Sequence, residues 1–189
     1  MTTKELIAEI HENAVAHGWW KDDRGFGEIA ALIHSELSEA LEEYRNDKPF
    51  VYYAGTDASG CKVEEAQPIP PIVVKPEGIA VELADTVIRI LDYFGKIGFM
   101  PAEVCASNPD TDDVDDDRYE NFGDFVTNCH ADVSAAFDDL NEERNLFLCD
   151  CAARIERWFS KNGLSLEEVI QIKNEFNKSR PYRHGGKKC

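Results

Sequence analysis

The stretch FGEIAALIHSELSEALEEY, residues 26–44, decides the fold. Apolar side chains recur in it at steps of three and four residues, which places them on one face of an α-helix. These positions are Ile29, Ile33, Leu37, Leu41 and Tyr44. A second stretch, IAVELADTVIRILDYF at residues 79–94, is also amphipathic. We therefore expect two amphipathic helices that can pack side by side.

Both helices carry acidic residues at the edge of the apolar stripe. Glu36 and Glu39 are spaced i, i+3 in the first helix, and Glu82 and Asp85 repeat this spacing in the second. Like charges this close repel one another in a helix, and ionised carboxylates near a core need a partner. A shared cation would supply it, so the sequence predicts a hard-cation site. The alternative is a solvated acidic face, which is what such spacing usually means.

Composition limits the classes of partner. The chain has 189 residues, 43% of them hydrophobic, and a net charge of -17, so it can form a core within a strongly negative field. That field repels nucleic acid and membrane surfaces, and we expect neither as a partner. An anionic substrate then requires a metal ion or a local basic patch. The chain shows no apolar signal core and no segment of transmembrane length, which predicts a cytoplasmic protein with free thiols.

Two segments interrupt the helical pattern. Residues 3–17 form a further amphipathic stretch, but the periodicity stops from 46 to 76, where five of the eight prolines occur. The runs VYY and CKVEE flank a turn signal there, which predicts a short hairpin or a loop cover inserted between the two motif helices. Residues 106–120 are rich in aspartate and predict a solvated acidic linker. Their spacing lacks the glycine and glutamate of a calcium-binding loop.

The chain repeats itself after this linker. Residues 26–44 align without a gap with 122–140 (FGDFVTNCHADVSAAFDDL), and 83–104 align with 148–169 (LCDCAARIERWFSKNGLSLEEV). We therefore expect a duplication, with a first unit at 1–105 and a second, degenerate unit at 121–189. The four acids become, in order, Asp132, Ala135, Phe147 and Asp150. Two carboxylates are lost, so we expect the second unit to hold no metal cluster of its own.

One pair of histidines and a basic tail complete the pattern. His34 and His130 occupy the same place in the two copies, which favours packing or a hydrogen bond between helices over catalysis. The tail IQIKNEFNKSRPYRHGGKKC, residues 170–189, concentrates basic residues. Lys173, Asn177 and Arg180 in it share one predicted helix face. The alternative is a tail that only suits the helix dipole.

These motifs resemble those of the MazG-like nucleoside triphosphate pyrophosphohydrolases. This all-α superfamily includes the dimeric dUTPases. The resemblance rests on the EXXE and EXXD motifs at residues 36–39 and 82–85. Gly-Trp-Trp at 18–20, Lys-Pro-Glu-Gly at 75–78 and the tail NKSRPYRHGGK support it. The 42 residues between Glu39 and Glu82 exceed the spacing usual in the family.

The resemblance implies a fold and an activity. It implies an all-α helical bundle of MazG-like type that hydrolyses a nucleoside triphosphate between the α and β phosphates, giving a nucleoside monophosphate and pyrophosphate. The implied metal ligands, for Mg²⁺ or Mn²⁺, are Glu36, Glu39, Glu82 and Asp85. The implied phosphate contacts are Lys75, Lys173, Asn177 and Arg180. Trp20 is the implied contact for the base or ribose, and Glu43 is a candidate to orient the attacking water.

Assembly and two other functions remain open from the sequence. Because family members dimerise to build each site, a duplicated chain can act as a monomeric pseudo-dimer with one composite site, or it can pair again as a homodimer. A non-catalytic nucleotide-binding regulator would use the same ligands. An acidic DNA mimic or interaction protein would instead display its carboxylates on an exposed face and ignore Mg²⁺.

Overall fold

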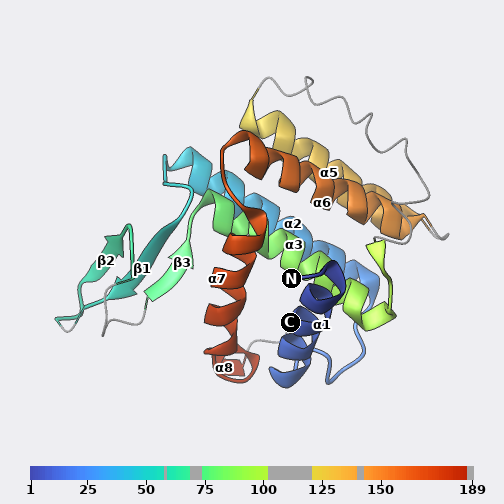
Figure 1. Ribbon diagram of the computed structural model, residues 1–189, viewed down its shortest axis with the longest axis horizontal. Helices are drawn as coiled ribbons and strands as arrows, with labels where there is room; N and C mark the ends of the chain where they lie inside the picture. The colour runs from blue at the N-terminus through green and yellow to red at the C-terminus, as the bar shows by residue number, and fades with distance from the viewer. Residues whose placement is uncertain (58, 69–73, 102–120, 140–142, 187–189) are drawn as a thin grey trace.

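The computed structural model describes residues 1–57, 59–68, 74–101, 121–139 and 143–186, with the side chain of His184 left out (Figure 1). Helices dominate this part of the chain, as the sequence predicts. They are α1 (Thr3–Ala16), α2 (Phe26–Arg45), α3 (Ile79–Ile97), α5 (Phe122–Asp138), α6 (Arg144–Lys161), α7 (Leu166–Lys178) and the short α8 (Arg183–Gly186). The predicted acidic linker at 106–120 lies outside the described residues.

A small sheet corrects the strictly all-α prediction. Its strands are β1 (Tyr52–Thr56), β2 (Lys62–Glu65) and β3 (Val74–Glu77), all antiparallel in the order β2-β1-β3. The hairpin expected in the 46–76 insertion is confirmed as β1 and β2, whose register pairs Tyr53 with Glu65. The third strand was not expected. Its Pro76 lacks a backbone N–H group, which β3 tolerates because it lies at a sheet edge. The sheet projects from the end of the helical body where α2 ends and α3 begins (Figure 1).

Gly78 joins the sheet to α3. Its φ of 116° is positive, a backbone conformation that favours glycine. An added Cβ would lie 2.6 Å from the carbonyl oxygens of Pro49 and Phe50. The backbone N–H of Ala80 donates to the Phe50 carbonyl at 2.9 Å. The first turn of α3 is therefore fastened to the chain that leaves α2.

Helices α2 and α3 form one helical hairpin, α5 and α6 form a second, and the two hairpins pack against each other. Helices α2 and α5 run antiparallel, because the ring of Phe122 at the start of α5 stacks on Tyr44 near the end of α2, with centroids 4.6 Å apart. Midway along both helices, the Nδ1 atoms of His34 and His130 lie 2.8 Å apart. The expected contact between these histidines is thus confirmed. Fully buried core side chains come from both hairpins and include Ile33, Leu37, Ile90, Val133, Leu148 and Ile155.

Helices α1 and α7 cover α3 on its remaining side (Figure 1). Asn13 of α1 donates to Asn174 of α7 at 2.9 Å, and Lys178 pairs with Glu9 at 2.8 Å. Helix α7 also contacts β3. The C-terminal part of the chain is thereby placed beside the acidic faces of α2 and α3. Among the described residues, no helix is both long and apolar enough to cross a bilayer.

Candidate metal and phosphate site

Three of the four predicted carboxylates converge. Glu36 of α2 and Glu82 and Asp85 of α3 each offer an oxygen atom, and these atoms all lie within 4.8 Å of one another. The group, called here the carboxylate cluster, is unusual in its burial, since Glu36 is 7% exposed and Glu82 only 2%. Glu39 is exposed and does not join the cluster in this structure. Its carboxylate accepts a hydrogen bond from Ser35 at 3.3 Å instead.

Two fixed cations contact the carboxylate cluster. The ammonium group of Lys173, from α7, lies 2.7 Å from an Asp85 oxygen and 3.8 Å from a Glu82 oxygen. Lys173 is only 2% exposed. The guanidinium of Arg89 donates twice to one oxygen of Glu36, from Nε at 3.0 Å and from Nη2 at 2.8 Å. Three acidic side chains therefore face two basic ones, and Glu36, Glu82 and Lys173 among them are buried.

The cluster has less positive charge than its carboxylates require. Burial raises the pKa of Glu36 despite the opposing effect of Arg89, and burial raises the pKa of Glu82 to about 9 despite that of Lys173. For Lys173, burial works against the charged form, but the attraction of Asp85 and Glu82 holds its pKa above the usual value. Additional positive charge at this point would stabilise the ionised carboxylates.

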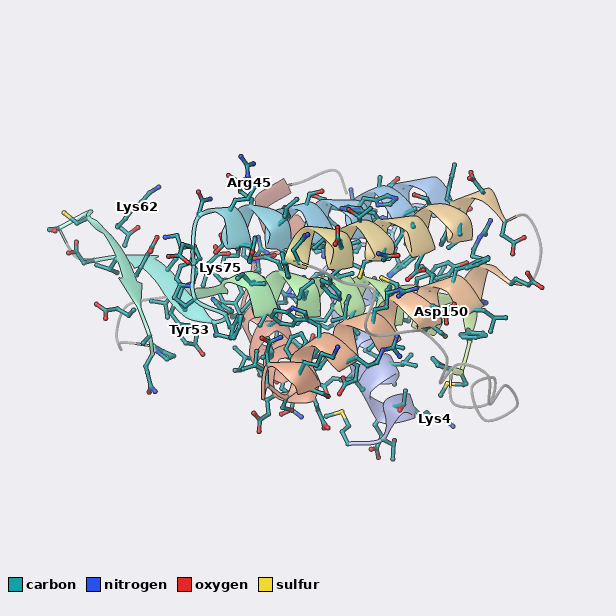
Figure 2. The ribbon with its side chains drawn as sticks, turned by 90° about the horizontal axis from the view of Figure 1, so that it is seen from above. Lys4, Arg45, Tyr53, Lys62, Lys75 and Asp150 are labelled. Atoms are coloured by element: carbon teal, nitrogen blue, oxygen red, sulfur yellow. The ribbon has the colours of Figure 1, made fainter. Side chains whose placement is uncertain are left out.

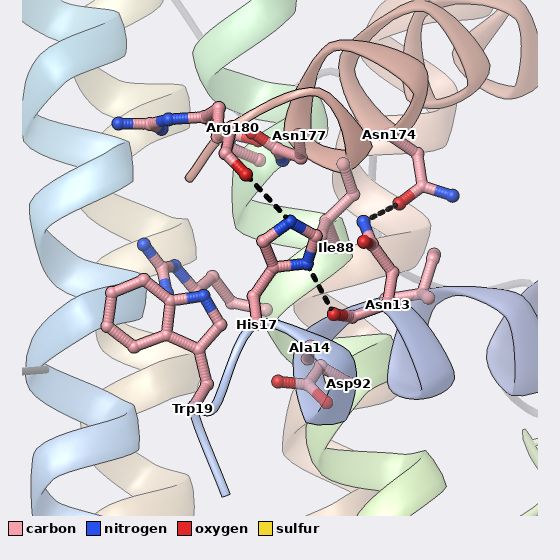
Figure 3. Close-up of a pocket in the computed structure, with 12 residues that line it drawn as sticks. Asn13, Ala14, His17, Trp19, Ile88, Asp92, Asn174, Asn177 and Arg180 are labelled. Carbon is pink, nitrogen blue, oxygen red and sulfur yellow. Dashed lines mark hydrogen bonds between the residues drawn. The ribbon is translucent and has the colours of Figure 1, made fainter. Parts of the chain in front are cut away.

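A polar cleft adjoins the carboxylate cluster (Figure 3). Helices α1, α3 and α7 form its walls, and it is lined by Asp85 of the cluster and by Arg89, which contacts the cluster through Glu36. Asn177 and Arg180 line the opposite side, with the guanidinium of Arg180 extending toward α2 (Figure 3). The Oδ1 atom of Asn177 is buried without a hydrogen-bond partner among the described residues. Burial lowers the pKa of Arg180, although the charge of Asp85 opposes this shift.

His17 fixes the chain that carries Arg180. Its Nδ1 lies 2.8 Å from the carbonyl oxygen of Asn13, and its Nε2 lies 3.0 Å from the carbonyl oxygen of Arg180 (Figure 3). The backbone N–H of Arg183 donates to the His17 carbonyl at 3.0 Å. Arg180 itself follows the end of α7 rather than sharing its helical face, which corrects the sequence prediction.

The adjacent residues Trp19 and Trp20 have different surroundings. Trp19 lines the cleft, whereas Trp20, which the sequence analysis selected, donates from Nε1 to Asp92 at 2.8 Å. Asp92 also contacts Nδ1 of His11 at 2.7 Å. Trp20 is thus engaged in a hydrogen-bond network between α1 and α3. Trp19 is the tryptophan nearer to the phosphate candidates.

Lys75 and Glu43 lie toward the sheet, outside the residues that line the cleft. Lys75 of β3 pairs with Glu77 at 2.8 Å, where the sheet meets α3 (Figure 2). Its charge opposes the rise that burial causes in the pKa of Glu82, so it acts on the cluster from a distance. Glu43 lies two helical turns beyond Glu36, about 10 Å along the helix axis. Burial raises the pKa of Glu43, and a hydrogen bond with Tyr52 opposes the shift.

The structure adds three residues that the sequence analysis did not select. These are Arg89, Trp19 and His17. Arg89 carried a signal, because it follows Asp85 by four residues and therefore shares its helix face. The Gly-Trp-Trp run at 18–20 indicated both tryptophans without choosing between them, and His17 carried no signal, since the turn after α1 decides which side chains face the cleft.

The second unit carries a related ion pair. Asp132 of α5 accepts from Nε of Arg154 of α6 at 2.7 Å. Asp150, on α6 toward the end away from the sheet, is half-buried (Figure 2), and burial raises its pKa. Phe147 stands where the first unit has Glu82. In this unit Asp132 is therefore paired with an arginine, and a phenylalanine replaces one of the four acids.

Comparison with known proteins gives no relative. No protein-family model, no curated protein and no solved structure matches this chain. The function is therefore argued from the residues of the site.

Proposed function

We propose that the protein hydrolyses a (deoxy)nucleoside triphosphate between the α and β phosphates, with Mg²⁺ or Mn²⁺ as cofactor, to a nucleoside monophosphate and pyrophosphate. The single observation that carries this proposal is the convergence of three carboxylates on a buried lysine, beside a polar cleft that Arg89 and Arg180 line. Carboxylate oxygens are the ligands that these hard cations prefer.

The donor set fits a divalent ion on two grounds. The three oxygens lie within 4.8 Å of one another, which is close enough to share one cation. Burial raises the pKa of Glu36 and Glu82, so the cluster gains stability from extra positive charge. Glu36, Glu82 and Asp85 would hold the ion. When bound, it supplies charge stabilisation for the phosphate oxygens and lowers the pKa of bound water.

The other residues act on the substrate. In the proposed reaction a water oxygen bonds to the α-phosphorus, the bond to the bridging oxygen breaks, and pyrophosphate leaves. Arg180 and Asn177 would hold phosphate oxygens through charge-assisted and amide hydrogen bonds. Lys173 would neutralise charge beside Asp85. Trp19, in the same cleft, offers a ring for the base or ribose.

The cleft must widen for a nucleotide to enter. Its volume is about 80 Å³, below the roughly 300–1,000 Å³ of small-molecule sites. We propose that the segment beyond the end of α7 moves, because it lies outside the long helices and is fastened by hydrogen bonds of His17 and Arg183 and by the ion pair of Arg183 with Asp22. Substrate binding would therefore displace the Arg180 segment while the cores of α2 and α3 stay in place.

We also propose that the chain is an internal duplication of MazG-like type. The equivalent histidines His34 and His130 contact each other, as equivalent residues do on a two-fold axis. A duplicated chain can bury in one polypeptide the surface that a dimer buries between two. The chain would then be a cytoplasmic pseudo-dimer with one composite site, to which the second unit contributes α7 and Arg180.

Aligned positions support this duplication independently of the histidines. Glu36 pairs with Arg89, and the aligned Asp132 pairs with the aligned Arg154. Both units also end the second hairpin helix with a glycine of positive φ, 69° at Gly98 and 67° at Gly163. Ungapped sequence repeats with matching ion pairs and caps are difficult to obtain from two unrelated hairpins.

The test is product analysis with a panel of nucleoside triphosphates and Mg²⁺. We expect pyrophosphate, rather than orthophosphate, and at least a hundredfold loss of turnover in Asp85→Asn. The matched control is Asp150→Asn, which changes the aligned residue of the second unit and should retain activity. Absence of pyrophosphate from every triphosphate tested, or equal turnover in the two variants, would contradict the proposal.

A nucleotide-binding regulator is the second candidate, since its ligand set would be the same. Lys173 favours it in one respect, because a buried ammonium already balances part of the cluster without a metal. Such a protein would bind the triphosphate with Mg²⁺ and release it unchanged. The burial of Glu36 and Glu82 argues against an acidic mimic, whose carboxylates must reach a partner.

A further inference from the structure

A second pocket lies between the two helical hairpins, at the end of the molecule that carries the sheet. Five aromatic rings surround it: Tyr44, Phe50, Phe122, Phe125 and Trp158. Its volume is about 380 Å³, within the range of small-molecule sites. None of its lining residues belongs to the carboxylate cluster or to the cleft beside it. We call it the aromatic pocket.

The rings form one connected framework. Trp158 lies at its centre, edge-on to Phe50 at 5.3 Å and roughly parallel to Phe125 at 6.1 Å between centroids. Phe122 lies 5.9 Å from Trp158 and stacks on Tyr44 at 4.6 Å. Faces and edges in several orientations therefore border one space. A planar conjugated ligand can stack on one ring and meet the edge of another.

The outer rings are exposed although they are largely apolar. Tyr44 is 49% and Phe50 is 38% exposed. Exposed apolar residues that are contiguous and surround a pocket often mark a ligand-binding site. The backbone of Phe50 is held in place by a hydrogen bond, because its carbonyl oxygen accepts from the N–H of Ala80 at 2.9 Å. The ring is thus held at the pocket by a rigid chain.

The charge of the lining identifies the class of ligand. Lys161 and Arg154 line the aromatic pocket, and no acidic residue does so among the described residues. This is notable in a chain with 37 acids and 20 bases. Arg154 pairs with the carboxylate of Asp132, which does not itself line the pocket. The pocket therefore combines stacking surfaces with local positive charge.

We propose that the aromatic pocket binds a nucleotide as a second ligand, distinct from the substrate of the carboxylate cluster. The base stacks among Phe50, Trp158 and Phe122, and the phosphate meets Lys161. This site needs no metal ion. The pocket draws Phe50 from the first unit and Trp158 from the second, so its ligand joins the two units. The inference stands whether or not the carboxylate cluster is catalytic.

The experiment is calorimetric titration of the full chain with AMP, GMP, CMP and UMP in EDTA. EDTA removes metal-dependent binding at the carboxylate cluster. We expect one-to-one binding of at least one nucleotide. Phe50→Ala should weaken it about five- to 150-fold, as expected for the loss of one stacked ring. Lys161→Gln should weaken it and flatten its dependence on salt.

Matched variants separate this site from the rest of the molecule. Phe137→Ala removes a similarly exposed ring outside the pocket, and Lys62→Gln removes an exposed lysine of β2; both should bind as the wild type does. Asp85→Asn should also bind normally, which distinguishes the aromatic pocket from the cleft. The far-ultraviolet circular dichroism of Phe50→Ala should match the wild type. No binding of any of the four nucleotides at millimolar concentration, or binding lost in Asp85→Asn and kept in Phe50→Ala, would overturn the proposal.

Discussion

At the scale of single residues, Lys173 has the most consequential position. A fully buried ammonium contacts two carboxylates that would otherwise be uncompensated. Removing one partner of a buried ion pair costs far more than the pair itself contributes, because the remaining charge keeps its desolvation penalty. The same ammonium lies where a divalent cation would be attracted. Lys173 therefore connects the stability of the fold to the chemistry of the site.

This connection gives a prediction for Lys173→Met. We expect the free energy of unfolding to fall by about 3–5 kcal/mol without metal, as for other broken buried ion pairs. Saturating Mg²⁺ should recover most of the loss, because the metal replaces the missing positive charge. Urea unfolding with and without Mg²⁺ measures both quantities.

Lys178→Met is the control for that measurement. Lys178 is also on α7 and also pairs with acids, but its side chain is 39% exposed. Exposed pairs contribute less than about 1 kcal/mol. An equal destabilisation of Lys173→Met in the presence and absence of Mg²⁺ would show that no cation binds near the missing ammonium.

At the scale of helices, the contact between α2 and α5 contains a titratable pair. Burial lowers the pKa of His34, and burial together with the charge of its partner lowers the pKa of His130. The unfolded chain therefore binds protons more readily than the folded protein below about pH 6.5. Stability from this pair is present in full above that pH and is lost as the pH falls through the lowered folded values.

The expected result is a fall in unfolding free energy between pH 7 and pH 5 that is smaller in His130→Asn. The substitution removes one titrating ring and keeps a polar group of similar size at the helix contact. Urea unfolding at several pH values, on both proteins, gives the two slopes. Identical slopes would mean that the histidine contact does not contribute to the pH dependence.

The elements differ in how far the sequence predicts them. Ile29, Ile33 and Leu37 mark α2 because burial on one side imposes a 3.6-residue period, and that period also brought Glu36 near Glu82. Strand β3 has no such period. Its formation depends on pairing with β1 across a segment of the chain, which local sequence does not specify.

The candidate site was predictable where helix geometry determines it and unpredictable elsewhere. Asp85 and Arg89 share a face whatever surrounds them. Whether Lys173 points inward or into solvent depends on how α7 packs on α3. Which of Trp19 and Trp20 lines the cleft depends on the turn that follows Gly18. These are tertiary outcomes. Sequence spacing names the candidates for such positions without choosing among them.

At the scale of the whole molecule, the two hairpins share one hydrophobic core. Buried side chains of α1, α2, α3, α5, α6 and α7 form a single cluster. We therefore expect one cooperative unfolding transition, although the sequence repeats. Trp158 fluorescence in a variant with Phe at positions 19 and 20 should report the same midpoint as far-ultraviolet circular dichroism. Two separate midpoints would indicate units that fold independently.

The proposed metal site is tested most directly by measuring whether the carboxylate cluster binds a divalent cation. Titration of the protein with Mn²⁺, followed by electron paramagnetic resonance of the free ion, measures this binding without substrate or turnover. We predict saturable binding by the wild type and by Asp150→Asn, and a loss of at least tenfold in affinity for Asp85→Asn. Equal affinity in all three proteins, or no saturable binding by the wild type, would contradict the claim that these buried acids form a metal site.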